Sequence, residues 1–118
     1  MRSVIFYHLP NGPCPIEIFL DSLTGKQAKK ITWVLKLIEE LENVPIQYFK
    51  KLIGQDDLWE VRVQFGSDDF RLLGFFESGV LVILTNAFIK KTQKTPVREI
   101  ELAGRRRKDY LSRRLDNE

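Results

Sequence analysis

The 118-residue sequence is poor in the residues that build disulfides and metal sites, with one cysteine and one histidine. Cys14 alone cannot form an internal disulfide, and His8 alone cannot complete a spaced Cys/His cluster for zinc. The apolar run at 80–84 is far too short to cross a bilayer, and the N-terminal residues lack the long apolar segment of a secretion signal. We therefore expect a cytoplasmic protein that binds no membrane and needs no metal or other cofactor.

Several motifs that identify enzymes are also missing. The sequence has no Gly-rich phosphate-binding loop, no H-E-x-x-H zinc motif, and no histidine other than His8 to activate a serine or cysteine. Enzymes defined by these motifs are therefore not the first interpretation of this chain.

Positive charge is concentrated near the C-terminus. The net charge is only +3, but residues 1–89 hold nine Lys/Arg against eleven Asp/Glu, whereas residues 90–114 hold ten against three. Such a basic block predicts a polyanionic partner, with nucleic acid as the first choice and an acidic protein or membrane surface as the second.

Hydrophobic spacing predicts one α+β domain over residues 1–118. Apolar residues recur every three or four positions at 15–23 and 26–43, which predicts a helical hairpin that Pro45 ends. LWEVRVQF alternates with a period of two, as a strand does. The expected strands are 4–7, 58–65, 69–77 and 80–89. We expect a small antiparallel sheet, made of the N-terminal strand and a three-strand meander, packed by the helical hairpin.

A basic helix is expected after the sheet. Thr95 can cap it, Pro96 can begin it, and it would run toward Arg113 with a weak apolar stripe. Residues 105–118 would form the basic end of this helix or a mobile tail.

The strands carry cations at positions that a meander could bring to one surface. Arg62 and Arg71 lie in successive strands. Lysines flank the meander: Lys50 and Lys51 before it, Lys90 and Lys91 after it. Taken singly, each has a structural alternative, such as an ion pair of Arg62 with Glu60 or Glu77, or a solvated strand end. Together they favour phosphate binding.

An RNA-binding surface could extend from this cluster. Phe88 lies at the same strand end as Lys90 and is a candidate for base stacking, although core packing is the alternative. Basic residues beyond the strand could contact phosphates or simply be solvated: Lys94, Arg98, Arg105 and Arg106.

The order of strand, two helices and meander, with LWEVRV followed by FRLLGFFESGVLVILTNAFIKKTQKTPVREIELA, resembles the RelE/ParE toxin superfamily. Within it the chain looks most like the phage-derived, HigB-like branch. The resemblance implies a toxin of a type II toxin–antitoxin pair, an endoribonuclease that cuts mRNA on the ribosome and so inhibits translation and growth. It also implies a cognate antitoxin, a small helix-turn-helix DNA-binding protein. The positions that match the catalytic cations of RelE-like members are Lys51, Arg62, Arg71, Lys90 and Lys91.

The implied chemistry is metal-independent cleavage by the 2′-OH of the RNA, which leaves a 2′,3′-cyclic phosphate. Lys51 or Lys91, deprotonated in a crowded cationic site, could act as base, so the general acid and base stay open. We expect Arg71→Ala to leave the fold intact and to abolish growth inhibition. Two other functions compete: inhibition of gyrase, as in ParE-type relatives, and noncatalytic binding of nucleic acid or protein.

Overall fold

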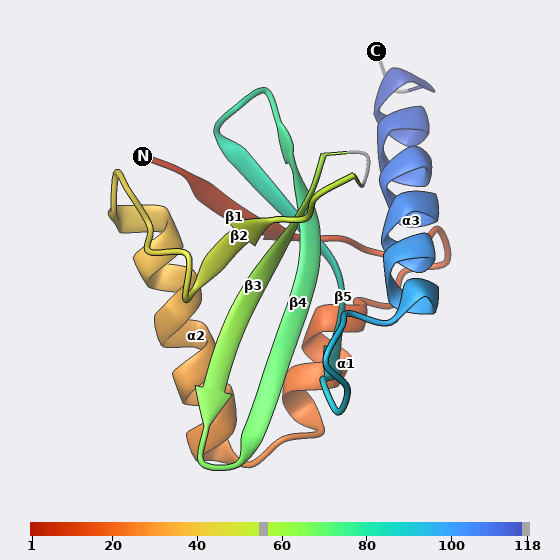
Figure 1. Cartoon of the computed structure of the whole chain (residues 1–118). Helices are drawn as coiled ribbons and strands as arrows, with labels where there is room; N and C mark the ends of the chain where they lie inside the picture. The colour runs from red at the N-terminus through yellow and green to blue at the C-terminus, as the bar shows by residue number, and fades with distance from the viewer. Residues whose placement is uncertain (55–56, 117–118) are drawn as a thin grey trace.

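The computed structural model describes residues 1–54 and 57–116. Its elements follow one another in the order strand, two helices, four strands and a long terminal helix (Figure 1). Their bounds are β1 Ser3–Phe6, α1 Pro15–Asp21, α2 Gly25–Glu40, β2 Phe49–Lys51, β3 Leu58–Phe65, β4 Asp68–Glu77, β5 Leu81–Ile89 and α3 Val97–Asp116. The expected α+β class is confirmed, while residues 117–118 of the expected basic tail lie outside the described residues.

The five strands form one mixed sheet in the order β1-β5-β4-β3-β2. The meander β3-β4-β5 is antiparallel, as expected, but β1 runs parallel to β5, with Ser3 opposite Leu81 and Phe6 opposite Leu84. The prediction of a purely antiparallel sheet was therefore wrong. The crossover through α1 and α2 explains the parallel pairing, because parallel neighbours need a long connection. The short strand β2 was not predicted, since three residues are too few to show a period.

Helices cover both faces of the sheet. In Figure 1, α2 lies to the left of the sheet and α3 to the right. Ile16 of α1 packs into the same core as Ile31 of α2, so α1 covers the face that α2 covers. The hairpin face packs alternate residues of the meander into a continuous apolar core: Val61, Val63, Phe70, Leu72, Val82 and Leu84. A second, smaller core lies beneath α3: Leu58, Leu73, Phe75, Ile83 and Ala103. Because side chains alternate between the two faces along β3 and β4, each of these strands contributes residues to both cores.

The ends of α2 are fixed by local hydrogen bonds. At its start, Thr24 and Gln27 form a capping box in which each side chain bonds the other residue's backbone. At its end, the Arg2 guanidinium donates to the carbonyl oxygens of Ile38 and Leu41, so the chain N-terminus is tied to the C-terminal end of α2. The helix stops at Glu40, three residues before the predicted end.

The start of α3 differs from the prediction. The helix begins at Val97, after Pro96, and the Thr95 hydroxyl donates to the Oε2 atom of Glu60 on β3. Thr95 therefore links the loop before α3 to the sheet, and its predicted role as a helix cap was wrong. Farther along, Tyr110 and Leu111 extend the contact of α3 with the second core.

A bulge in β5 changes which of its side chains face α3. Register is lost by one residue between the pairs Gly74–Leu84 and Leu73–Asn86, which leaves Thr85 without a partner residue in β4. A side chain at Gly74 would collide with the backbone carbonyl of Ile83, so this position requires glycine.

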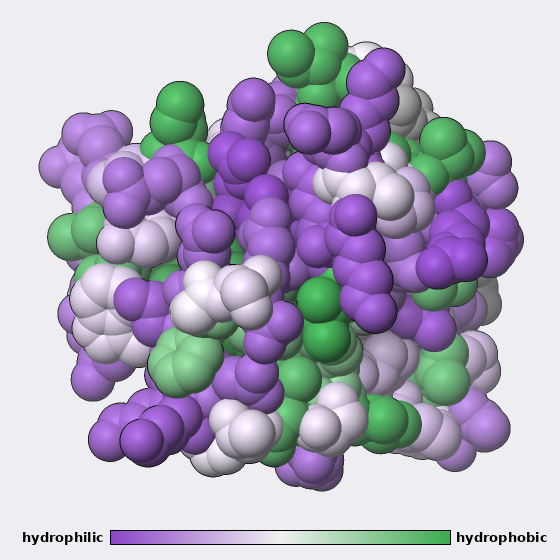
Figure 2. All heavy atoms as spheres, turned by 60° about the horizontal axis from the view of Figure 1, so that its bottom comes forward, coloured by the Kyte–Doolittle hydropathy of each residue, from purple (hydrophilic) through white to green (hydrophobic). Residues whose placement is uncertain are grey.

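Within the described residues, no helix combines the length and the apolar character that a membrane span requires. The surface turned forward in Figure 2 is largely hydrophilic, interrupted by separate apolar patches.

Candidate nucleic-acid interface and active site

Charged side chains occupy the part of the sheet next to the α3 core. Arg62 of β3 lies directly opposite Arg71 of β4, and Arg71 lies opposite Phe88 of β5. Paired residues on neighbouring strands point to the same face, so the three side chains share one surface. The meander thus brings the two arginines together, as the sequence predicts.

Two adjacent arginines repel each other, and the carboxylate of Glu60 compensates. Its Oε1 atom lies 3.5 Å from Nε of Arg62 and 3.3 Å from Nε of Arg71. Glu60 is 3% exposed, and its other oxygen, Oε2, accepts the hydrogen bond from the Thr95 hydroxyl. A buried charge is tolerated when it is paired and hydrogen-bonded, and Glu60 meets both conditions.

Arg71 is enclosed more than Arg62. It is 6% exposed, and its Nη1 atom donates to Oδ1 of Asp69. Burial lowers the pKa of the Arg71 guanidinium, while the charges of Glu60 and Asp69 act in the opposite direction. The side chain is therefore a fixed cation between two carboxylates.

Hydrogen-bonding capacity is left over at this cluster. The Nε atoms of both Arg62 and Arg71 are buried and make no hydrogen bond within the described part of the chain. A guanidinium presents five N–H donors in a planar fork that matches two oxygens of a phosphate. Both buried Nε atoms lie beside the Glu60 carboxylate, so an anionic ligand would be bound by the outer nitrogens of Arg62, whose side chain is 30% exposed.

A cleft of about 450 Å³ opens beside Glu60 and Arg62. Five cations are among the residues that line it: Lys50, Lys51, Arg62, Lys90 and Lys94. Its apolar lining comes from Leu52, Ile53, Val97 and Ile100. A concave site lined by cations and apolar walls concentrates positive potential, which attracts a polyanion.

Lys50 and Lys51 point to opposite faces of β2. Lys50 pairs with Glu60 and so shares the face of the arginines, whereas Lys51 pairs with Trp59. The Nζ atom of Lys51 also lies 3.2 Å from Oδ1 of Asp57. The sequence placed Lys51 among the catalytic residues and Lys50 among the RNA-binding ones, and the register favours Lys50 as the one nearer the arginines.

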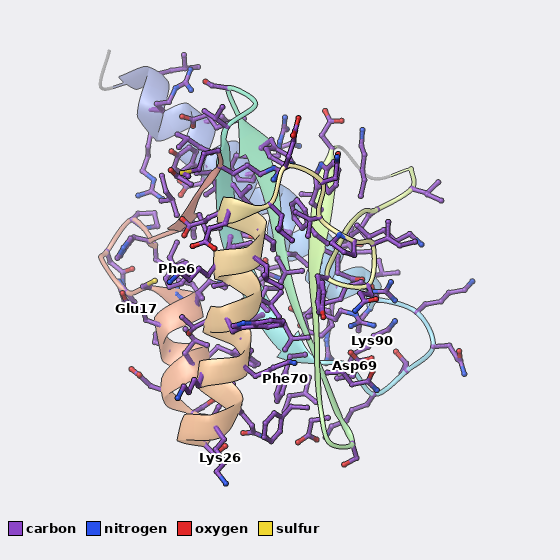
Figure 3. All side chains as sticks on the ribbon, turned by 90° about the vertical axis from the view of Figure 1, so that its left-hand side faces the viewer. Phe6, Glu17, Lys26, Asp69, Phe70 and Lys90 are labelled. Carbon is purple, nitrogen blue, oxygen red and sulfur yellow. The ribbon has the colours of Figure 1, made fainter. Side chains whose placement is uncertain are left out.

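Lys90 and Lys91 separate in a similar way. The backbone N–H of Lys90 donates to the carbonyl oxygen of Asp69 at 2.7 Å, and Figure 3 shows the two residues side by side, away from α1 and α2. In contrast, neighbouring Phe70 points toward α1, where its ring meets Phe19 edge-on. Lys91 is exposed and is not among the described residues that line the cleft.

The remaining predicted RNA-binding residues are not exposed together beside the arginines, although Phe88 shares their face. Phe88 is partly buried against the core beneath α3. Arg106 donates to the carbonyl oxygen of Thr85 at 2.7 Å, and burial lowers the pKa of its guanidinium, so it supports the bulge. Arg98 and Arg105 are exposed on α3, and Arg98 lies 3.8 Å from Glu99.

Sequence reasoning treated Glu60 only as an ion-pair partner of Arg62 and missed its position between the two arginines. The available signal was its place in LWEVRVQF, where it alternates with Leu58 and Arg62 on the face that α3 covers in part. Thr95 and Asp69, the hydrogen-bond partners of Glu60 and Arg71, were also missed as members of the site. The Thr95–Glu60 contact is tertiary and has no sequence signal. Asp69 and Arg71, in contrast, lie two residues apart on β4 and so share a face, which the alternation of a strand could have indicated.

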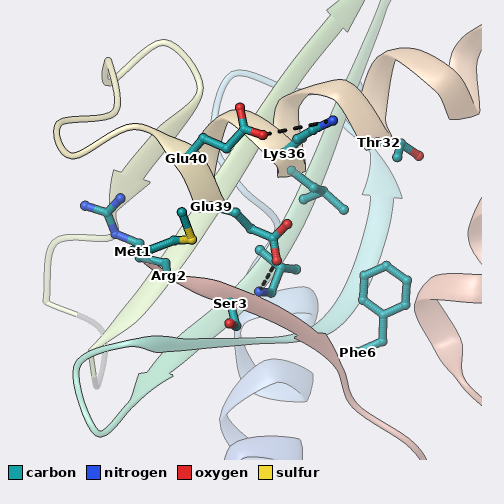
Figure 4. Close-up of a pocket in the computed structure, with 10 residues that line it drawn as sticks. Met1, Arg2, Ser3, Phe6, Thr32, Lys36, Glu39 and Glu40 are labelled. Carbon is teal, nitrogen blue, oxygen red and sulfur yellow. Dashed lines mark hydrogen bonds and ion pairs between the residues drawn. The ribbon is translucent and has the colours of Figure 1, made fainter.

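A second hollow of similar size lies far from this chemistry in the fold, between β1 and α2 (Figure 4). Its volume is about 470 Å³, and its charges pair locally: Lys36 with Glu40, and the Glu39 carboxylate with the backbone N–H of Val4. The latter bond covers part of the open edge of β1. This hollow has no cationic excess to attract a polyanion.

The described residues contain no group of three or more His, Cys, Asp or Glu side chains placed to hold a metal ion.

Comparison with known proteins places the chain in a family. No curated protein matches it. A family model described as phage-derived protein Gp49-like (DUF891) matches residues 18–108. The match includes α2, the whole meander and the basic start of α3, and therefore every residue of the arginine cluster. The chain belongs to the phage-derived Gp49-like family.

Proposed function

We propose that this protein is the toxin of a type II toxin–antitoxin system, in the HigB-like branch of the RelE/ParE superfamily, and that it cuts mRNA as an endoribonuclease. The observation that supports this proposal is the buried Glu60 carboxylate between Arg62 and Arg71, beside a cleft lined with lysines. It joins a proton acceptor to the cations that a phosphate requires. Such a pairing is what RNA cleavage by an internal nucleophile needs.

The reaction uses the 2′-OH of the substrate as its nucleophile. Glu60 takes the proton of the 2′-OH, and the oxygen attacks the neighbouring phosphorus, so that an O2′–P bond forms and the P–O5′ bond breaks. The products are a 2′,3′-cyclic phosphate and a 5′-OH end. Arg62 and Arg71 bind the phosphate oxygens and stabilise the charge that develops in the transition state.

The leaving 5′ oxygen needs a proton, and the lysines of the cleft are placed to donate it. Lys50 shares the face of Glu60, and Lys90 follows β5 next to Asp69. We assign the general acid to this pair and the binding of flanking phosphates to Lys94 and Lys51, which line the same cleft. In this assignment the general base is the Glu60 carboxylate, in place of Lys51 or Lys91, which the sequence offered as candidate bases.

The proposed partners follow from the same charges. A positive cleft fits mRNA held on the ribosome in the cytoplasm, and an antitoxin that carries a helix-turn-helix domain would neutralise the toxin by covering this cleft. Coexpression with the adjacent gene product tests the last point, because a cognate antitoxin should restore growth and protect the cleft lysines from acetylation.

Substitution of Glu60 tests the catalytic assignment. Glu60→Gln keeps the shape of the side chain and its contact with Thr95 but removes the proton acceptor. We expect mRNA cutting to fall by about 10²–10⁴-fold, the usual contribution of a general base. The measurement is mapping of RNA ends after induction, with cyclic-phosphate ends in the wild type and cutting that persists in EDTA. The exposed acid Glu40, replaced by Gln, is the matched control.

A noncatalytic binding protein is the second candidate, and one observation favours it. Glu60 and Asp69 balance the charges of Arg62 and Arg71, which is also the pattern of a structural ion-pair cluster. A protein of this kind would bind RNA with strong salt dependence and release no fragments. Full cutting by a folded Glu60→Gln variant would contradict the catalytic assignment, and RNA binding by the wild type without cutting would establish the second candidate.

A further inference from the structure

A smaller hollow shares Arg62 with the lysine-lined cleft. Its volume is about 200 Å³, less than half that of the cleft. The residues that line it are Gln47, Arg62, Val63, Gln64, Asp69 and Arg71. Arg62 lines both hollows. A phosphate bound by Arg62 would therefore adjoin both the cleft, which has more room for the chain, and this hollow, whose smaller volume suits a single base.

The polar groups of this hollow are available to a ligand. Gln64 lies opposite Asp69 in the β3–β4 pair and is exposed, while Gln47 precedes β2. Neither glutamine side chain makes a hydrogen bond to another described residue. The hollow thus offers two free amides, each with two N–H donors and one carbonyl acceptor.

Asp69 supplies an acceptor whose position is fixed from two sides. Its Oδ1 atom accepts from Arg71, and its backbone carbonyl accepts from the Lys90 N–H. The side chain is nevertheless 32% exposed, and a carboxylate has lone pairs for further donors. A pre-positioned carboxylate beside free amides is a base-reading arrangement, since bases in single-stranded RNA are recognised by hydrogen bonds on their Watson–Crick edges.

We propose that this hollow is a guanine-binding subsite for the nucleotide next to the phosphate at Arg62. The proposal rests on the ribonuclease function above. Guanine alone presents two adjacent donors, N1–H and N2–H, to a carboxylate, and its O6 atom can accept from Gln47 or Gln64. Adenine and cytosine place a ring-nitrogen lone pair beside their amino group, which would face the Asp69 oxygens, and uracil flanks its single N–H with two carbonyl oxygens.

The test compares binding of four short RNAs that differ only in the base beside the scissile step. A 2′-deoxy sugar at that step prevents cutting, and fluorescence anisotropy gives the affinities. We expect the guanine RNA to bind the wild type about tenfold more tightly than the others, as one bidentate contact allows. Asp69→Asn offers one acceptor and one donor, a pattern that fits the amino group and ring nitrogen of adenine or cytosine, so the preference should move from guanine to these two bases.

Two further variants keep the test decisive. Asp68→Asn makes the same change of charge at a residue that contacts Gln27 of α2, and it should keep the guanine preference. Gln64→Ala, at an exposed position, should reduce the preference several-fold even if Asp69→Asn weakens the fold.

Three outcomes would overturn the proposal. Equal affinity for all four RNAs would leave phosphate binding intact and remove the guanine subsite. An equal loss for every RNA in Asp69→Asn would show that Asp69 serves only as the anchor of Arg71. Absence of binding to every one of these RNAs, whether free or held on the ribosome, would reject the ribonuclease function and the subsite with it.

Discussion

The two faces of the sheet differ in what they contain, although the same strands build both. The face toward α1 and α2 is closed by apolar side chains along its length, with Phe70 fully buried against Phe19. The face toward α3 is apolar near Leu58 and Phe75 and becomes charged at Arg62 and Arg71. One face therefore provides most of the stability, and the uncovered half of the other is available for chemistry.

The largest expected effect would come from the closed face. Phe70→Ala removes a side chain with no exposed surface, and we expect it to lower the free energy of unfolding by about 3–5 kcal/mol. Urea unfolding measures the change. Ile53→Ala, at a side chain that is 90% exposed, should change stability by less than about 0.5 kcal/mol. Similar losses of stability in the two variants would contradict the difference in burial between the two side chains.

Substitution of the two arginines in the charged half of this face should have different effects on stability. Arg71→Ala leaves Glu60 and Asp69 without their shared buried cation, so we expect a loss of about 3 kcal/mol together with loss of cutting. The earlier expectation that this variant keeps its fold intact is therefore revised.

Arg62→Ala provides the matched comparison, because the Arg62 side chain is 30% exposed and Arg71 still faces Glu60. We expect a loss of stability near 1 kcal/mol with a similar loss of cutting. Thermal unfolding and RNA-end mapping on the same samples separate the two effects. Equal destabilisation by both substitutions would contradict the difference in burial.

A third effect concerns the attachment of α3. The Tyr7 hydroxyl donates to Oδ2 of Asp109, and this bond lowers the pKa of Asp109, while burial raises the pKa of Tyr7. The depressed acid contributes stability above its ordinary pKa of 3.8, and this contribution is lost as the pH falls through the lower folded value. The raised phenol contributes below its ordinary pKa of 10.0, and that is lost on going to higher pH.

Tyr7→Phe should therefore cost about 1 kcal/mol between roughly pH 4 and pH 10 and less outside that window. Unfolding curves at several pH values measure this dependence. A cost that stays constant at all pH values would show that the bond to Asp109 is not its source.

The smallest effect should distinguish the two lysines after β5. Lys90→Ala should weaken RNA binding and reduce the salt slope by about one, because Lys90 lines the cleft. Lys91→Ala should leave both nearly unchanged. Titrations at several salt concentrations check this difference, which would disappear if both lysines contacted the RNA.

The sequence predicted the meander well because its strands are long enough to alternate. The β3 bounds match LWEVRVQF residue for residue. In β2, however, a shift of one residue decides whether Lys50 or Lys51 faces the arginines, and three residues carry too little pattern to reveal it. The parallel pairing of β1 depends on tertiary packing and likewise could not be predicted from the sequence.

The candidate site was predicted in part for a similar physical reason. Cations in successive strands indicated that Arg62 and Arg71 would meet. The contacts that organise them come from residues distant in sequence, such as Thr95 with Glu60, which are 35 residues apart. Periodicity within a segment contains no information about such contacts.

The bulge at Thr85 reverses the odd–even alternation of side chains between the two faces of β5. Before it, Leu81 and Ile83 face α3; after it, the parity is reversed, so Phe88 and Lys90 take that face. If β5 kept its sequence but paired regularly with β4, Thr85 would lie opposite Leu73, and Lys91 in place of Lys90 would follow on this face. Gly74, which permits the bulge, thus determines from the neighbouring strand which lysine reaches the cleft.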